Sequence, residues 1–441
     1  MVINLGIGAL SLYEIARCTR ASLSPAVNST HVPARLVTNS KEITAGDVFC
    51  ALRGKADGHD FIEEALARGA SAIICESAPH PSLPTLSVDS VVLALGAWAR
   101  HALDLHKPTV IAITGSVGKT TTKNTLAALL AANAPTHATE GNQNNSLGVP
   151  FTVLSAPVGT RFLVAECGTD HPGEIRQLSS LLQPDIAVIT CIGHAHIGTF
   201  GSREAIAKEK LAIARHMRGG TLFVPFGEPL TAFAPSENAT SISVNLPKER
   251  ERTALGLADT DLPALWALAY TEAIARHLGL SFEKSKANLT QAAHSRRKEF
   301  WEKGVLWIDD CYNASPESVY AAILSFVPHT GEKILILGDM LELGDKTPAM
   351  HRSMGKLAIL HANICFFFGA YASYYAEGAR SAGGASRTGA RRYFQILNGT
   401  AEEMAQSILP FIRKGSAVLA KASRALRAED VLYQTKEMYV P

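Results

Sequence analysis

A glycine turn followed by a lysine and three threonines is the stretch best suited to chemistry. It lies between a β-branched run and a helix-forming tail. In such a strand–turn–helix unit, glycines let the backbone approach an anion, and N–H groups of the turn and helix N-terminus point at it. Lys119 would reach outer phosphates and the Thr120 hydroxyl would coordinate magnesium. The predicted nucleotide-binding residues are Gly115, Ser116, Val117, Gly118, Lys119, Thr120 and Thr121.

This turn is a variant of the usual phosphate-binding pattern. The full GxxxxGKT spacing needs glycine at position 113, where the chain has Ile113. A GxxGKT sequence can also arise by chance in a connecting loop, so a purely structural turn is the alternative. The strand before it and the helix after it favour nucleotide binding. The chain has no NKxD base-reading motif, which argues against a GTPase.

Two further residues are candidate metal ligands. Glu166 ends the apolar run 161–166, at the carboxyl edge of a strand where ligands of such sheets collect. Magnesium prefers oxygen ligands of this kind. His196 lies in a glycine-rich loop after the next strand. The alternatives are a solvated strand end for Glu166 and a structural role for His196.

The elements that must position these residues alternate between short apolar runs and helical stretches. Continuous apolar runs separated by helices predict parallel strands that are covered on both faces, and hence an α/β chain. The expected strands are 109–114, 161–166, 185–190, 221–225, 305–309, 334–338, 364–368 and 416–420.

Two breaks in composition divide the 441 residues, which are too many for one ordinary core. Proline and serine crowd together at 77–90, and a polar, basic segment occupies 281–300. We therefore expect three domains, at 1–84, 85–298 and 299–441. The polar segment 234–253 is expected to be a loop or small hairpin inside the middle domain.

Bulk composition narrows the function classes. The chain is 47% hydrophobic and 19% charged, with a net charge of +2, so it is typical of a globular protein without a nucleic-acid footprint. No apolar run approaches the roughly 20 residues of a membrane span, and no basic segment opens a signal peptide. Seven scattered cysteines without a CxxC pair indicate reduced thiols rather than disulfides or zinc. A cytoplasmic location is expected.

A series of motifs in order resembles one family over nearly the whole chain. They are TNSKEITAGDVFCALRGKADGHDF (38–61), TGSVGKTTTK, EGNQNNSLGVP, AECGTDHPGEI, GHAHIGTFGS, IAKEKLAI, IDDCYNASPES, LGDMLELG and KASR (421–424). Together they are similar to the Mur ligases of peptidoglycan synthesis. The resemblance implies a central P-loop ATPase-type parallel sheet and a C-terminal Rossmann-like domain.

The resemblance also implies a reaction. A substrate carboxylate attacks the γ-phosphate of ATP to give an acyl phosphate, and an amine then displaces phosphate. The YNASPES and GDMLELG motifs point to a UDP-muramoyl tripeptide and D-alanyl-D-alanine as substrates. Two anions must approach each other, so positive charge from Lys119, the helix N-terminus and magnesium is required. A monomer is expected.

The resemblance supports the roles already given to Lys119, Thr120 and Glu166 and implies several more. Lys119, His196 and Lys210 would be catalytic, and Thr120, Glu166, His196 and Lys210 would bind metal. Lys210 matches a lysine that the family carbamylates; a carbamate, unlike an ammonium, can ligate a cation. A solvated lysine on a mixed-charge helix is the alternative. Arg297, Asp310 and Asn313 would contact ATP, and the substrate-binding residues would be Ser40, Asn142, Asn145, Asp339 and Arg424.

The chain departs from the family pattern in places. Asn39 and Lys41 replace an aspartate and an arginine, and lysine lacks the planar fork that binds a diphosphate. Pro263, Ala264 and Ala267 occupy positions where polar residues are usual near adenine. The alternatives are another ligase of the superfamily, either tripeptide-forming or like folylpolyglutamate synthase, and a P-loop ATPase without ligase activity.

Overall fold

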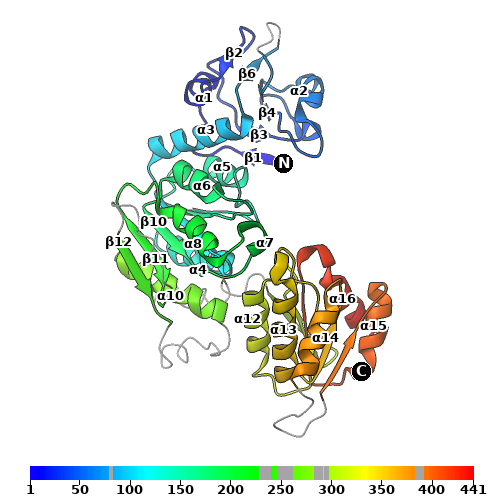
Figure 1. Cartoon of the computed structure of the whole chain (residues 1–441). Helices are drawn as coiled ribbons and strands as arrows, with labels where there is room; N and C mark the ends of the chain where they lie inside the picture. The colour runs from blue at the N-terminus through cyan, green and yellow to red at the C-terminus, as the bar shows by residue number, and fades with distance from the viewer. Residues whose placement is uncertain (79–82, 228–239, 247–261, 283–291, 293–296, 383–391) are drawn as a thin grey trace.

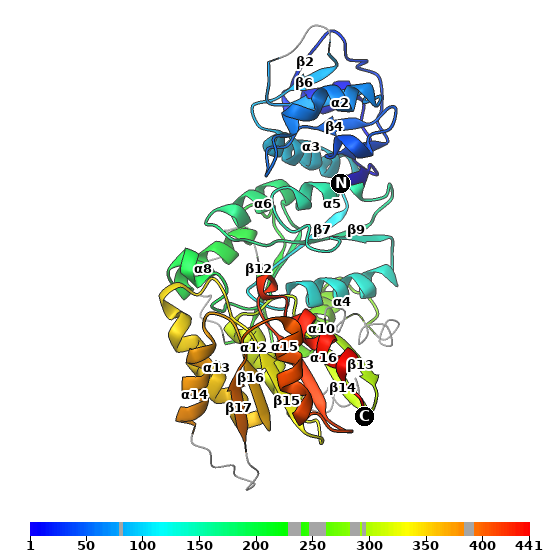
Figure 2. The same ribbon diagram turned by 90° about the vertical axis from the view of Figure 1, so that its right-hand side faces the viewer.

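The computed structural model describes residues 1–78, 83–227, 240–246, 262–282, 292, 297–382 and 392–441. Their strands form three six-stranded sheets. The sheets follow one another along the molecule, each in a domain with its own helices (Figure 1). In a view turned by 90°, the first domain lies at one end of the molecule, and the central domain lies between it and the third (Figure 2). The predicted α/β fold in three domains is confirmed.

The first sheet is mixed. β1 pairs with β3, and β2 with β6, in antiparallel fashion, and the remaining pairs are parallel. Its strand order is β1 (Val2–Asn4), β3 (Arg35–Val37), β4 (Val48–Cys50), β5 (Ala72–Cys75), β6 (Thr85–Ser87) and β2 (Ser22–Leu23). Its helices are α1 (Leu12–Thr19), α2 (Ile62–Ala67) and α3 (Val91–His106). The indole N–H of Trp98, on α3, donates to the Gly8 carbonyl at 3.0 Å and ties this helix to the first domain.

The central sheet is parallel throughout. Its strand order is β12 (Thr240–Val244), β11 (Thr221–Pro225), β10 (Ile186–Ile189), β7 (Thr109–Thr114), β9 (Phe162–Glu166) and β8 (Thr136–Ala138). Ile111 and Ile113 face α4 (Lys119–Ala131) and α10 (Leu262–His277). Val110 and Ala112 face the other side, as the alternation of side chains along a strand requires. The helices on that side are α5 (Gly148–Ser155), α6 (Glu174–Leu182) and α8 (Arg203–Leu211).

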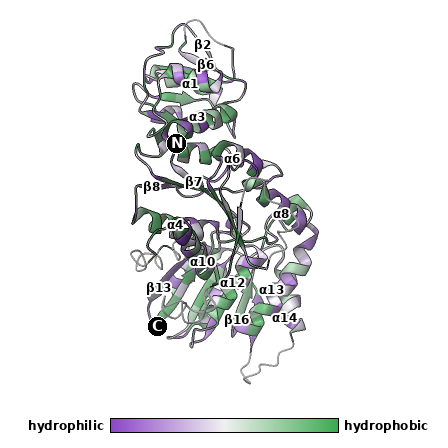
Figure 3. Cartoon of the chain, turned by 90° about the vertical axis from the view of Figure 1, so that its left-hand side faces the viewer, coloured by the Kyte–Doolittle hydropathy of each residue, from purple (hydrophilic) through white to green (hydrophobic). Residues whose placement is uncertain are grey.

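The third sheet has one antiparallel edge strand, β13. Its order is β13 (Lys298–Glu302), β14 (Val305–Asp309), β18 (Ala417–Lys421), β15 (Lys333–Leu337), β16 (Ile364–Phe367) and β17 (Tyr393–Ile396). Helices α12 (Pro316–Phe326), α13 (Thr347–His361) and α14 (Ala372–Ser381) cover one face, and α15 (Ala401–Ile408) and α16 (Ala428–Met438) cover the other. Hydrophobic strands flanked by helices of mixed polarity are visible in Figure 3. Among the described residues, no helix is both long and apolar enough to span a membrane.

All eight predicted strands are present. The expectation for 234–253 is wrong at β12, because Thr240–Val244 pairs in parallel with β11 at the edge of the sheet. The other residues of that segment fall largely outside the described part of the chain. The pairing registers place Ile113 of β7 opposite Glu166 of β9, and Thr114 opposite Ile189 of β10. The carboxyl ends of these three strands therefore lie side by side, and the candidate site is built on their loops.

Candidate active site

The predicted phosphate turn has the conformation that its glycines allow. Gly115 and Gly118 have φ angles of 147° and 85°, which L-residues rarely adopt. A Cβ atom on Gly115 would lie 1.9 Å from Oγ1 of Thr190. That hydroxyl donates to the Val117 carbonyl at 2.5 Å, so the turn packs tightly on the loop after β10. The Lys119 ammonium donates to the Gly115 carbonyl at 2.7 Å and lies over the turn.

Thr120 and Glu166 form a buried pair beside this turn. The Thr120 hydroxyl donates to Oε2 of Glu166 at 2.6 Å, and the side-chain amide of Asn144 donates to Oε1 at 2.9 Å. Glu166 is 1% exposed. The backbone N–H of Glu166 donates to the Thr139 hydroxyl at 3.0 Å, which fixes the end of β9. The result is a set of hard oxygen donors next to a cationic turn, and this set fits magnesium.

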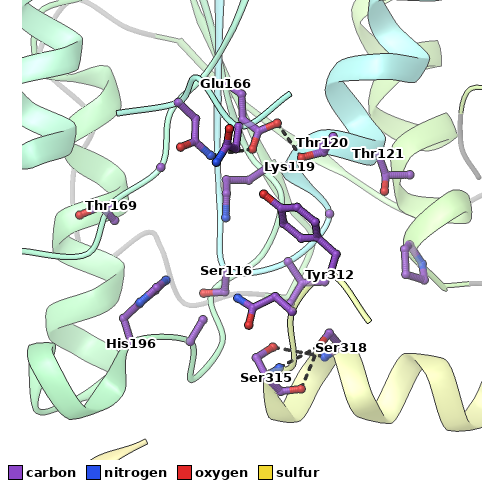
Figure 4. Close-up of a pocket in the computed structure, with 18 of the residues that line it drawn as sticks. Ser116, Lys119, Thr120, Thr121, Glu166, Thr169, His196, Tyr312, Ser315 and Ser318 are labelled. Carbon is purple, nitrogen blue, oxygen red and sulfur yellow. Dashed lines mark hydrogen bonds between the residues drawn. The ribbon is translucent and has the colours of Figure 1, made fainter. Parts of the chain in front are cut away.

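A cavity of about 540 Å³ lies in front of the turn, between the central and third domains. Figure 4 shows the ring of His196 and the amine of Lys119 directed into it, with Tyr312 and Ser315 on the opposite wall. The predicted site residues that line it are Ser116, Val117, Gly118, Lys119, Thr120, Thr121, Asn142, Asn145, Glu166, His196, Arg297, Asp310 and Asn313. Residues from both domains therefore meet in one space.

Lys421 holds the third-domain wall of the cavity in place. Its ammonium lies 2.9 Å from Oδ2 of Asp310 and donates to the carbonyls of Asp310 and Asn313 at 3.2 and 3.1 Å. Lys421 is 3% exposed. On the same wall, the Arg297 guanidinium pairs with Glu299 at 2.6 Å and contacts the Ser325 hydroxyl. The loop after β14 is thus fixed by a buried cation that reaches it from the end of β18.

His196 lies where the two domains touch. It precedes α7 (Ile197–Phe200) with a left-handed φ of 63°. Its Nδ1 lies 2.5 Å from Oε2 of Glu342 in the third domain and 3.6 Å from Oδ1 of Asp170. The hydrogen bond from His196 lowers the pKa of the Glu342 carboxyl, because it favours the ionised form.

Lys210 is buried on α8 with only 3% of its surface exposed. Burial, and then the charge of Lys119, lower its pKa to about 7, because both disfavour the ammonium. Among the described residues, no acidic side chain lies within ion-pair distance of it. Its neighbour Glu209 instead accepts hydrogen bonds from the Gly173 and Ile175 N–H groups, at 2.7 and 2.8 Å, and attaches α8 to the start of α6.

Comparison with known proteins identifies the family. Three models match: the Mur ligase middle domain over residues 113–261, the Mur ligase, glutamate ligase domain over 296–424, and the Mur ligase family, catalytic domain over 35–101. A UDP-N-acetylmuramoyl-tripeptide–D-alanyl-D-alanine ligase of Bacillus subtilis (strain 168) is 31% identical, covering 95% of this chain and 96% of its own length. The chain belongs to the Mur ligase family.

Solved structures of Mur ligases agree with this assignment. A crystal structure of MurF from Acinetobacter baumannii superposes with a TM-score of 0.83 and 28% identity, and covers 97% of this chain and 99% of its own. The MurF ligase from Thermotoga maritima in complex with ADP gives a TM-score of 0.78 and 30% identity, with 91% and 97% covered. A further relative with the same name as the Bacillus ligase, from Haemophilus influenzae, is 28% identical over 97% of this chain.

Five of the predicted site residues of this Mur ligase do not line the cavity. Gly115 is packed against Thr190 within the turn, and Lys210 is buried on α8. The Ser40 hydroxyl is in the first domain and donates to Glu64 at 2.7 Å. Asp339 accepts the N–H groups of residues 370 and 371 at 2.8 and 2.9 Å. Arg424 is largely exposed and pairs with Glu429 at 2.6 Å.

Four residues of this Mur ligase site were missed from the sequence. Asn144, rather than Asn142 or Asn145, reaches Glu166, and loop composition alone cannot distinguish these neighbours. Lys421, Tyr312 and Glu342 lie in motifs that the sequence singles out, but no local pattern says which side chain faces the cavity or another domain. The only sequence signal for these residues was that their motifs follow the carboxyl ends of strands, where ligands of such sheets bind.

Proposed function

We propose that this Mur ligase joins D-alanyl-D-alanine to UDP-N-acetylmuramoyl-tripeptide with ATP, a cytoplasmic step of peptidoglycan synthesis. The observation that carries the proposal is the cavity in which the phosphate turn and the Thr120–Glu166 pair face the Asp310–Asn313 loop. The relative from Bacillus subtilis carries the name of this reaction and covers nearly the whole chain. The enzyme forms a C–N bond at the expense of ATP.

The residues of the turn suit the first chemical step. The tripeptide carboxylate attacks the γ-phosphorus of ATP, and the bond from that phosphorus to the bridging oxygen of ADP breaks, giving an acyl phosphate. Both reactants are anions, so positive charge must be placed between them beforehand. The Lys119 ammonium and the N-terminus of α4 supply that charge at the turn.

The second step needs only an amine in the correct place. The free amine of the dipeptide attacks the acyl carbon, and the tetrahedral intermediate expels phosphate with its bonding electron pair. We propose that domain 299–441 receives the dipeptide, that domain 85–298 holds ATP, and that domain 1–84, with Ser40, holds the uridine nucleotide. The reaction then proceeds when the domains are in contact, because the cavity has walls from two of them.

Magnesium fits the oxygen donors of this chain. Thr120 and Glu166 offer hard ligands on the buried side of the cavity, and two protein ligands leave room for phosphate oxygens and water. When bound, the ion would neutralise charge on the transferring phosphoryl group. Asp310, Asn313 and Arg297 would hold the ribose end of ATP from the opposite wall.

We also propose that Lys210 is carbamylated and that it serves a second cation together with His196. Carbon dioxide reacts with a neutral amine, and a pKa of about 7 leaves about half of Lys210 neutral at pH 7. A carbamate would place an anion beside the charge of Lys119, which the ammonium form repels. This change would convert an unfavourable buried cation into an oxygen ligand.

The test is a reconstituted ligation. The enzyme is supplied with ATP, magnesium, UDP-N-acetylmuramoyl-tripeptide and D-alanyl-D-alanine, and phosphate release is measured together with the mass of the product. Omission of each substrate in turn provides the controls. We expect phosphate release only with both substrates present, and a product heavier by the dipeptide less one water. Phosphate release that does not depend on the dipeptide would show an ATPase without ligase activity.

Assays with alternative substrates distinguish this reaction from those of the related ligases. Replacing the tripeptide with the UDP-muramoyl dipeptide, and D-alanyl-D-alanine with a single amino acid, tests a tripeptide-forming ligase. Folate and glutamate test the folylpolyglutamate synthase-like reaction. Size-exclusion chromatography with light scattering tests the proposed monomer, for which a mass near 47.0 kDa is expected.

A further inference from the structure

A turn of the third domain docks its backbone directly against the loop that carries His196. The N–H of Gly198 donates to the Glu342 carbonyl at 2.9 Å. A Cβ atom on Gly198 would lie 2.8 Å from the backbone nitrogen of Gly344, so only glycine allows this approach. The Glu342 side chain then extends from the docked turn to His196.

Both residues at this contact have strained backbones. His196 and Glu342 have φ angles of 63° and 66°, in the left-handed region that non-glycine residues rarely adopt. Such conformations persist only where the surroundings fix them, and they gather at functional sites. Two of them facing each other across a domain boundary point to a function for the side-chain contact.

The contact has the chemistry of a supported metal ligand. The Glu342 carboxylate can only accept, so Nδ1 of His196, 2.5 Å away, must donate its proton. In the neutral ring the other nitrogen, Nε2, then has a free lone pair, and His196 lines the cavity. A histidine that binds a metal almost always donates its second ring N–H to a carboxylate or carbonyl, which fixes the tautomer and ring orientation.

We infer that Glu342 is a positioning residue that sets the tautomer and direction of His196 from the third domain. The inference rests on the proposed role of His196 in binding a second cation. It adds that this cation site is complete only when the third domain is docked, because the supporting carboxylate belongs to that domain. Metal affinity at His196 and domain docking are therefore coupled, and each strengthens the other.

A second histidine–glutamate contact provides a matched control. Nδ1 of His194 lies 2.6 Å from Oε1 of Glu317, which lies near the start of α12 in the third domain. This pair also joins the two domains, but neither residue lines the cavity. Removing Glu317 therefore weakens docking without touching the partner of His196.

The experiment measures Mn²⁺ as a probe by electron paramagnetic resonance, on the full chain with a non-hydrolysable ATP analogue. The variants are Glu342→Ala, Glu342→Gln, Glu317→Ala and His196→Ala. We expect His196→Ala to abolish one class of bound Mn²⁺. Glu342→Ala should weaken the same class about 10- to 100-fold, and Glu342→Gln should weaken it less because an amide oxygen still accepts. Glu317→Ala should weaken it much less than Glu342→Ala, because it reduces docking without removing the partner of His196.

A second readout follows the ring itself. Nitrogen-15 NMR of histidine-labelled enzyme should show His196 protonated at Nδ1 in the wild type, and shifted toward protonation at Nε2 in Glu342→Ala. An unchanged tautomer, unchanged Mn²⁺ affinity in Glu342→Ala, or equal losses in Glu342→Ala and Glu317→Ala would overturn the inference. If His196→Ala removes no Mn²⁺, the proposed second cation itself fails, and the two failures are distinguishable.

Discussion

Replacing Lys210 with methionine should make the protein more stable while removing its activity. Lys210 is 3% exposed, and no acidic side chain among the described residues lies within ion-pair distance. Methionine keeps most of the side-chain length and removes only the charge, so packing is largely preserved. A residue kept for structure alone would give the opposite result, because its loss would destabilise the fold.

The size of the effect follows from the pKa. Burial and the charge of Lys119 lower the pKa of Lys210 from 10.5 to about 7, and each pH unit of difference corresponds to about 1.4 kcal/mol. The buried lysine therefore lowers the free energy of unfolding at pH 7 by about 4 kcal/mol at most. Between pH 7 and 10.5 the unfolded chain binds more protons than the native one, so wild-type stability rises with pH in this window. The advantage of the variant should be largest at and below pH 7 and disappear toward pH 10.5.

The assay compares guanidinium unfolding of wild type and Lys210→Met at pH 7 and at pH 10, in buffers freed of carbon dioxide. Lys208→Met is the control, because Lys208 is exposed on the same helix and should change stability by less than about 0.5 kcal/mol. A Lys210→Met variant that is no more stable than wild type at pH 7 would refute the reasoning. So would an advantage that stays the same at pH 10.

Two further substitutions test the phosphate turn and the third-domain wall of the cavity. Gly115→Ala should lose ATP binding and about 3 kcal/mol or more of stability, because its Cβ would strike Oγ1 of Thr190. Gly159→Ala is the control, because Gly159 also has a left-handed backbone but open space around it. It should cost only about 1–2 kcal/mol in thermal unfolding. Lys421→Met should raise the KM for ATP and destabilise the third domain by about 3 kcal/mol, since it breaks a largely buried pair with Asp310; unchanged ATP kinetics would contradict this role.

In the central and third domains, the fold could be predicted from the sequence where a strand is buried on both faces. All eight expected strands are continuous apolar runs in the interior of the central and third sheets. Strand β12 was missed because it lies at the edge: its residues Thr240–Val244 are mostly exposed, and only the last is buried. An edge strand with polar side chains carries the signal of a loop, since only one of its sides is paired with another strand.

The candidate site could be predicted best where the ends of neighbouring parallel strands build it. The Gly115–Thr120 turn and the position of Glu166 follow from strand ends that a parallel sheet places side by side. Asp339 of the GDM motif shows the limit of such predictions. It was expected to bind substrate, but it accepts two N–H groups of a neighbouring loop. Its side chain caps that loop, and composition cannot distinguish a carboxylate that caps a loop from one that binds a substrate.

Glu342 could not be found from the sequence because domain docking brings it to His196, and this has a consequence for mutants. Thr120 and Glu166 are placed by a rigid sheet edge, so their loss should weaken nucleotide and metal binding whether or not the third domain is docked. Glu342 acts across the domain boundary on His196, so its loss should be felt only in the docked form. Measurements on the nucleotide-bound enzyme and on the free enzyme should therefore differ for Glu342 and agree for Thr120 and Glu166.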